Sequence, residues 1–157
     1  MLENREITII SSEFERIPKQ FPADFKDFNI MIKPHYFSLS QEKYKKQRQL
    51  LEFWSEYNNV YLAKVSDYSL VPFLATADLL MSDASSAIIE FAALDKPVIW
   101  CNFLQLRWNY RGIFAYRFKN RMDKDYDEYS KIAVQSDSYE ELKNNIKEQI
   151  LNPTSLS

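Results

Sequence analysis

The residues with the clearest chemical potential lie in one polar turn, Asp83–Ser86. The apolar run Leu79–Met81 before this turn predicts a buried strand, and Ala87–Leu94 after it repeats apolar residues at helical spacing. Ser85 and Ser86 would then stand where a helix begins. Hydroxyls and free backbone N–H groups at such a position bind anions such as phosphate. The alternative role of both serines is plain N-capping of the helix.

Four other polar residues could complete such a site. His35 is the single histidine, and its unperturbed pKa of about 6.5 suits contact with a diphosphate or proton donation to a leaving phosphate. Glu90 lies one helical turn beyond Ser86, so that both can face one ligand. Arg111 could neutralise a phosphate through two parallel hydrogen bonds, and Asp83 is expected to orient its own turn. The structural alternatives are a packed histidine, a surface glutamate and a surface ion pair.

These residues need a scaffold, and the apolar pattern predicts strands that alternate with helices. The predicted strands are Glu6–Ser12, Phe28–Lys33, Val60–Val65, Leu79–Met81, Val98–Cys101 and an edge strand at Lys131–Val134. The predicted helices are a short one near Pro18 and Pro22, then Ser40–Tyr57, Ser69–Thr76, Ala87–Leu94 and Asp137–Leu151. This alternation predicts an α/β fold, with a Rossmann-like, mostly parallel sheet and helices on both faces.

Such a sheet binds ligands beyond the carboxyl ends of its strands. Polar residues follow the predicted strands at that edge, namely His35, Asp67, Asp83–Ser86 and Asn102. Several polar turns that converge on one edge are a stronger indication of a ligand site than any one of them. The basic residues of the Ser40–Tyr57 helix are instead interpreted as a solvated face.

Composition limits the function classes. With 157 residues, of which 46% are hydrophobic, the chain fits a single domain at 1–151, followed by a frayed tail at 152–157. A formal net charge of −2 argues against a general nucleic-acid binder. The single glycine, Gly112, excludes Gly-rich nucleotide loops. No cofactor is expected, and no His, Cys and carboxylate cluster suggests a metal.

The compartment can also be read from the sequence. Cys101 is the single cysteine and falls in an apolar run, which predicts a core position and a reducing compartment. The first residues do not resemble a signal peptide, and no apolar stretch approaches the roughly 20 residues of a membrane span. We therefore expect a cytoplasmic protein.

The stretch LLMSDASSAIIEFAALDKPVIW resembles the C-terminal lobe of the CDP-glycerol glycerophosphotransferase family, the teichoic-acid and capsule polymerases of the GT-B fold. The positions that match the family pattern are Ser82, Asp83, Ser85, Ser86, Glu90, Lys96 and Pro97. A second match, Ile30–Phe37, has a strand followed by a basic residue, one spacer and His-Tyr. A weaker match is Tyr110-Arg111-Gly112 followed by Phe114.

The resemblance implies a function and a set of roles. The chain would bind a CDP-linked polyol donor, and the enzyme would move glycerol phosphate, or another polyol phosphate, to a cell-surface polymer acceptor and release CMP. His35 would be catalytic. The donor phosphates would contact Ser85, Ser86 and Arg111, and the ribose and base would contact Glu90, Ser66 and Asp67.

The resemblance leaves partners and alternatives open. The N-terminal lobe of the family has no counterpart here, so the expected partners include a separate N-terminal lobe or a second copy of the chain, and peripheral association with the inner face of the plasma membrane is compatible with the family. A second enzyme interpretation is a GT-B glycosyltransferase or a UDP-sugar epimerase-like lobe. A third interpretation is a non-catalytic nucleotide-binding or interaction domain left by truncation.

Overall fold

The structure is a computed structural model that describes residues 5–11, 17–34, 42, 45–64, 66–67, 69, 71–82, 86–101 and 131–151. Its strands are β1 (Arg5–Ser11), β2 (Phe28–Pro34), β3 (Val60–Leu62), β4 (Leu79–Ser82), β5 (Val98–Cys101) and β6 (Val134–Ser136). Its helices are α1 (Phe21–Asp24), α3 (Lys45–Ser55), α4 (Val71–Thr76), α5 (Ser86–Ala92) and α7 (Tyr139–Leu151).

The strands form one six-stranded sheet in the order β3-β2-β1-β4-β5-β6. Every pairing is parallel. The predicted α/β, Rossmann-like fold is therefore confirmed, with a sheet that is wholly rather than mostly parallel. The strand order reverses between β1 and β4, which is the point where doubly wound sheets bind ligands.

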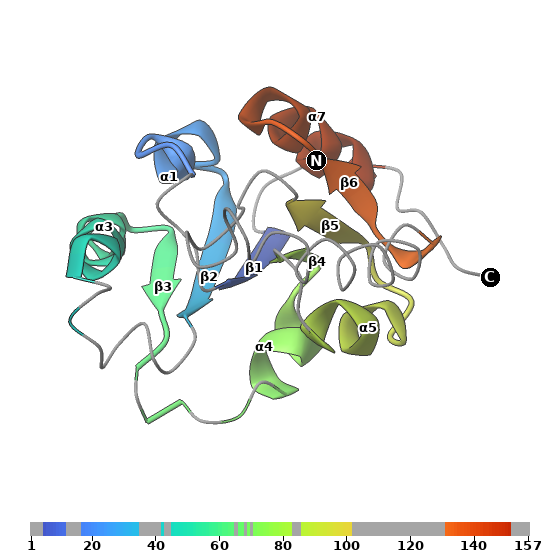
Figure 1. Ribbon diagram of the computed structural model, residues 1–157, viewed down its shortest axis with the longest axis horizontal. Helices are drawn as coiled ribbons and strands as arrows, with labels where there is room; N and C mark the ends of the chain where they lie inside the picture. The colour runs from blue at the N-terminus through green and yellow to red at the C-terminus, as the bar shows by residue number, and fades with distance from the viewer. Residues whose placement is uncertain are drawn as a thin grey trace, which may run out of the picture.

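Helices cover both faces of the sheet (Figure 1). On one face, α1, α3 and α7 enclose a large apolar core that includes Phe21, Trp54 and Ile146. On the other face, a smaller core that includes Phe91 and Trp100 lies beneath α4 and α5. All four residues of β4 and all four of β5 are buried, as expected for parallel strands that are covered on both faces.

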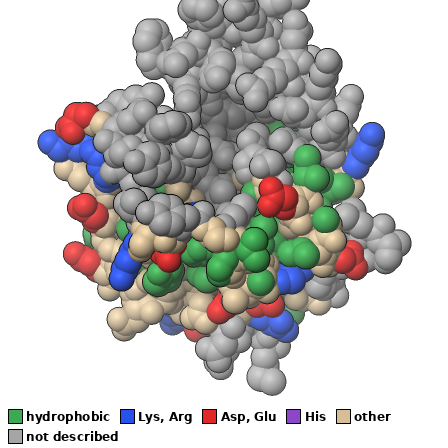
Figure 2. Space-filling model, turned by 90° about the horizontal axis from the view of Figure 1, so that it is seen from below, with side chains coloured by type: hydrophobic (Ala, Val, Ile, Leu, Met, Phe, Trp, Pro, Cys, Tyr) green, Lys and Arg blue, Asp and Glu red, His purple; other side chains and the backbone are tan. Residues whose placement is uncertain are grey.

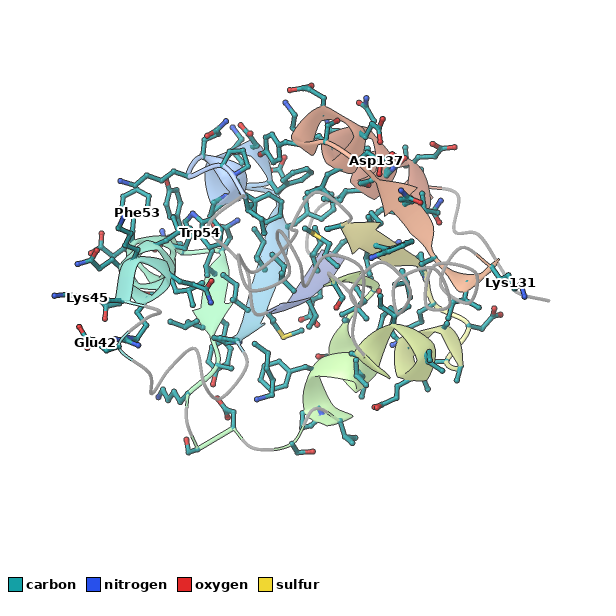
Figure 3. All side chains as sticks on the ribbon, in the orientation of Figure 1. Glu42, Lys45, Phe53, Trp54, Lys131 and Asp137 are labelled. Carbon is teal, nitrogen blue, oxygen red and sulfur yellow. The ribbon has the colours of Figure 1, made fainter. Side chains whose placement is uncertain are left out.

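Helix α3 follows the predicted amphipathic pattern, although it is described only from Lys45 to Ser55. Gln47, Leu51 and Trp54 are buried, whereas Lys45 is exposed. Figure 3 shows Trp54 on this helix, and its indole Nε1 donates a hydrogen bond to the backbone carbonyl of Lys19 at 3.0 Å. The prediction of a solvated basic face is confirmed where the structure describes it.

One prediction about local structure is wrong. The edge strand is Val134–Ser136 rather than Lys131–Val134, because its polar residues find partners: the side-chain amide of Asn145 donates to the buried Ser136 hydroxyl at 2.9 Å. In α5, Ile88 is buried but Ile89 is 48% exposed. The inward position beside Ile88 belongs to Phe91, three residues further along.

Other element bounds shift by a few residues at their ends. Helix α4 begins at Val71, and Ser69 precedes it as a cap, with its hydroxyl accepting a hydrogen bond from the Val71 N–H at 3.3 Å. Cys101 is buried, as predicted. Within the described residues, no helix has both the length and the apolar character needed to cross a membrane.

Candidate functional site

A cavity of about 540 Å³ lies beside α4, on the face of the sheet that carries α4 and α5. Figure 2 shows this face, on which hydrophobic side chains gather. The residues that line the cavity come from β2, β3, α4 and the loop between β3 and α4, and they are Met31, Tyr61, Ser66, Asp67, Ser69, Pro72, Phe73 and Thr76. The cavity therefore has an apolar floor and wall with a polar loop at the carboxyl end of β3.

Strand pairing creates the floor of the cavity. Met31 and Tyr61 are partners in the parallel register of β2 and β3, so their side chains share one face of the sheet. Helix α4 packs on β1, where the Thr8 hydroxyl donates to the backbone carbonyl of Phe73 at 3.4 Å. Because β3 is an edge strand that α4 does not fully cover, Tyr61 stays 46% exposed.

The loop after β3 is held in place by Asp67. Its carboxylate Oδ2 accepts hydrogen bonds from the Lys64 N–H at 2.7 Å and from the Tyr61 hydroxyl at 3.0 Å. The Asp67 N–H donates back to the Lys64 carbonyl at 2.9 Å. From the neighbouring strand, the Lys33 ammonium donates to the Asp67 carbonyl at 2.6 Å. These hydrogen bonds therefore hold the loop as a turn at the mouth of the cavity.

These hydrogen bonds also fix the protonation states. The Lys64 N–H, followed by the Tyr61 hydroxyl and the nearby Lys33 ammonium, holds the pKa of the Asp67 carboxyl below its ordinary value. The hydrogen bond to Asp67 raises the pKa of the Tyr61 phenol. At neutral pH the mouth of the cavity therefore carries a carboxylate and a protonated phenol that donates to it.

The wall of the cavity is aromatic. The Phe73 and Tyr61 ring centroids lie 6.4 Å apart with the rings tilted by 33°, and the Thr76 hydroxyl contacts the Met31 sulfur at 3.8 Å. Flat apolar walls with a few hydroxyls are typical of sites for planar heterocycles. The arrangement suits a nucleobase with polar groups at its edge.

The structure brings together some of the predicted site residues. Ser66 and Asp67 both line the cavity. Glu90 is exposed on α5 and does not line the cavity, and Ser86 is the first residue of α5. The remaining predicted site residues lie outside the described residues, and they are His35, Asp83, Ser85 and Arg111.

Sequence reasoning did not single out the other six residues of the cavity, and the two aromatic ones among them are Tyr61 and Phe73. Both fell inside predicted elements, so neither was considered as a ligand contact. The signal was present for Tyr61, because a large aromatic residue that alternates with apolar residues in a short strand is typical of a half-buried edge. For Phe73 no comparable signal exists, since an apolar residue in a short helix predicts core.

Lys96, one of the residues of the family pattern, has a structural role. Its ammonium donates to the backbone carbonyls of Leu74 at 3.3 Å, Ala75 at 3.0 Å and Ala77 at 3.0 Å, and it lies 5.6 Å from the Phe91 ring centroid. A cation at the last carbonyls of a helix satisfies acceptors that lack intrahelical partners. Lys96 therefore caps α4 and fixes one wall of the cavity. Over the described part of the chain, no group of three His, Cys, Asp or Glu side chains could hold a metal ion.

Comparison with known families settles the relationship. The family described as CDP-Glycerol:Poly(glycerophosphate) glycerophosphotransferase matches residues 10–111, which is more than half of the chain. The chain belongs to this family.

One individual relative agrees with this membership, and one solved structure bears on the fold. The chain is 37% identical over 59 residues to the teichoic acid glycerol-phosphate primase of Bacillus subtilis (strain 168), a match that covers 37% of this chain and 16% of the primase. A co-structure of S. aureus MnaA with UDP is 13% identical with a TM-score of 0.56, over 99% of this chain and 40% of that protein. This likeness confirms the fold, which is similar to that of GT-B glycosyltransferases.

A structure of the wall teichoic acid polymerase TagF is also similar, with a TM-score of 0.47 and 14% identity over 95% of this chain and 42% of that protein. The chain thus spans less than half the length of each of these three relatives.

Proposed function

We propose that this chain is the donor-binding, C-terminal lobe of a glycerophosphotransferase. The enzyme transfers glycerol phosphate, or another polyol phosphate, from a CDP-linked donor to a cell-surface polymer such as teichoic acid or capsule, and releases CMP. Residues 1–151 form the donor-binding domain. A separate N-terminal lobe or a second copy of the chain supplies the acceptor side, and the enzyme works in the cytoplasm, at the inner face of the plasma membrane.

One observation carries the proposal. Ser66 and Asp67, which the family resemblance assigns to the base and ribose, line a cavity with aromatic walls at the carboxyl end of β3. The volume of about 540 Å³ falls within the roughly 300–1,000 Å³ that is usual for small-molecule sites. A cytosine ring would lie against Phe73 or Tyr61, with its polar edge toward the Ser66 and Ser69 hydroxyls.

The remaining donor contacts are proposed from the family pattern. The diphosphate would bind at Ser85 and Ser86 with Arg111, and Glu90 would accept hydrogen bonds from the ribose hydroxyls. An acceptor hydroxyl would attack the transferred phosphorus and lose its proton, and the bond from this phosphorus to the oxygen of the CMP phosphate would break. His35 would either donate a proton to the departing CMP phosphate or contact it as a cation. Catalysis then consists mostly of positioning and of charge neutralisation at the leaving phosphate.

Calorimetric titration of the chain with CMP, CDP-glycerol and UDP tests the proposal. Binding of the cytidine compounds with weaker binding of UDP supports it. A preference for UDP favours the alternative of a UDP-sugar enzyme. This alternative is included because the chain is similar in fold to MnaA, whose structure contains UDP. If no nucleotide binds, the chain is a non-catalytic interaction domain and the proposal is wrong.

Two tryptophan variants locate the site. Ser66→Trp fills the mouth of the cavity and is expected to weaken CMP binding on the order of tenfold or more, equivalent to about 1.4 kcal/mol. Asn144→Trp adds the same side chain at an exposed position of α7, on the opposite face of the sheet. It should leave CMP affinity unchanged. Equal CMP affinities in the two variants would show that the nucleotide does not bind in this cavity.

A further inference from the structure

We propose that Lys33 is a positioning residue that holds the Ser66–Asp67 segment in the geometry that binds the donor. This inference rests on the proposed function, because it concerns the loop assigned there to the base and ribose. Lys33 does not line the cavity, so it acts through the loop and not by touching the donor.

A hydrogen bond joins Lys33 of β2 to the loop after β3. Lys33 lies on β2, is partly buried, and donates from its ammonium to the Asp67 carbonyl at 2.6 Å across 34 positions of sequence. A hydrogen bond from an ionised donor is roughly twice as strong as one between neutral groups. The loop is thereby attached to a strand other than the one that leads into it.

The other side-chain hydrogen bonds of the turn are local. The bonds from the Lys64 N–H and the Tyr61 hydroxyl to Asp67 join residues of one continuous segment. They give the turn its shape and attach it to β3, the strand that leads into it, but not directly to β2. The Lys33 bond attaches the loop directly to β2 at Asp67. This is four positions beyond Ala63, whose N–H donates a backbone bond to the Ile32 carbonyl of β2 at 2.8 Å.

The Lys33 ammonium lies between the loop and the aromatic wall of the cavity. The Lys33 nitrogen also lies 5.5 Å from the centroid of the Phe73 ring on α4, within the range of a cation–π contact. One charge therefore contacts both the loop and the aromatic wall of the cavity. Loss of this charge is expected to let the loop move away from Phe73 and to widen the mouth of the cavity.

Three variants test the role of Lys33. Lys33→Met keeps an apolar stem of similar length and removes the ammonium, and we expect CMP affinity to fall on the order of tenfold. Lys33→Arg keeps a charged donor and should restore most of the affinity. Lys147→Met is the matched control, because it removes an exposed ammonium on α7, on the opposite face of the sheet. It should bind CMP like the wild type.

Amide hydrogen exchange separates positioning from general stability. In Lys33→Met, the Asp67 N–H should exchange faster while amides in β1 and β4 keep their rates, because the loop opens without unfolding the sheet. Loss of protection throughout the sheet would mean that Lys33 only stabilises the fold, and this would overturn the inference. Unchanged CMP affinity in Lys33→Met would also overturn it.

Failure of the proposed function would look different. If the wild type binds no CMP, the donor role of the whole loop is wrong, and with it the donor role of Lys33. Exchange at Asp67 would then still show whether the ammonium holds the loop.

Discussion

The two faces of the sheet are covered in different ways. Under α1, α3 and α7, large side chains such as Phe21, Phe25 and Trp54 are at most 1% exposed. The other face carries α4 and α5, which are short. Tyr61 of β3 and Val71 of α4 stay exposed there, and a cavity lies beside α4. The first face is built for stability, since close-packed aromatic and aliphatic groups contribute most of the hydrophobic free energy. The second face keeps apolar surface available for a ligand.

The same contrast appears in the polar contacts. On the packed face, the side-chain amide of Asn59 donates to the carbonyls of Pro22, Phe25 and Phe28 at 3.0–3.2 Å, and this joins the start of β3 to the end of α1 and the start of β2. On the open face, Lys33 and Asp67 form the contacts of a loop at the cavity. Polar groups on one face join elements of the core, and on the other they shape a candidate site.

The largest expected effect is on the packed face. Trp54→Ala removes a side chain that is 0% exposed, together with its hydrogen bond to Lys19. We expect the free energy of unfolding to fall by about 3–5 kcal/mol, because a cavity is left behind. Urea denaturation measures this loss. CMP affinity of the folded fraction should not change, and a loss of affinity larger than the loss of stability explains would contradict the division between the faces.

A smaller loss of stability is expected at Lys96, which holds the end of α4 beside the cavity. Lys96→Met leaves the carbonyls of Leu74, Ala75 and Ala77 without their ammonium, and we expect unfolding to become easier by about 1–3 kcal/mol. Lys131→Met, at an exposed position, is the control. Thermal or urea unfolding of both variants measures the difference in stability. Equal stability in the two would mean that Lys96 is not the cap of α4.

The smallest effect concerns the protonation of the loop. The lowered pKa of Asp67 means that its carboxylate stabilises the turn fully above the ordinary value of about 3.9, and that this contribution is lost as pH falls through the lower folded pKa. Tyr61→Phe removes one of the hydrogen bonds to the carboxylate. We expect the Asp67 carboxyl, followed by NMR, to titrate at a higher pH in this variant. An unchanged titration would show that the phenol does not hold the loop.

Much of the fold could be predicted from the sequence because it rests on local patterns. The inward stripe Gln47, Leu51 and Trp54 follows helical periodicity, and β4 and β5 are uninterrupted apolar runs. The error at β6 has the opposite origin. A strand that contains Gln135 and Ser136 is stable only because β5 pairs with it and Asn145 bonds its polar groups, and this is information from distant residues.

The candidate site could be predicted only in part for the same reason. Ser66 and Asp67 were found because a polar turn after a strand is visible in the sequence. The aromatic wall was not, because the contact between the Tyr61 and Phe73 rings depends on where α4 packs on the sheet and on the strand order, which is set by long-range pairing. Lys96 shows a further limit, since a residue of the family pattern proved to be a helix cap.

Mapping of the nucleotide by NMR chemical shifts tests the central claim most directly. With CMP added to the labelled chain, we predict that the largest amide shifts occur in Tyr61, Ser66, Asp67 and Thr76, around the cavity of the open face. Shifts confined to α1, α3 and α7, or no shift at saturating CMP, would contradict the account.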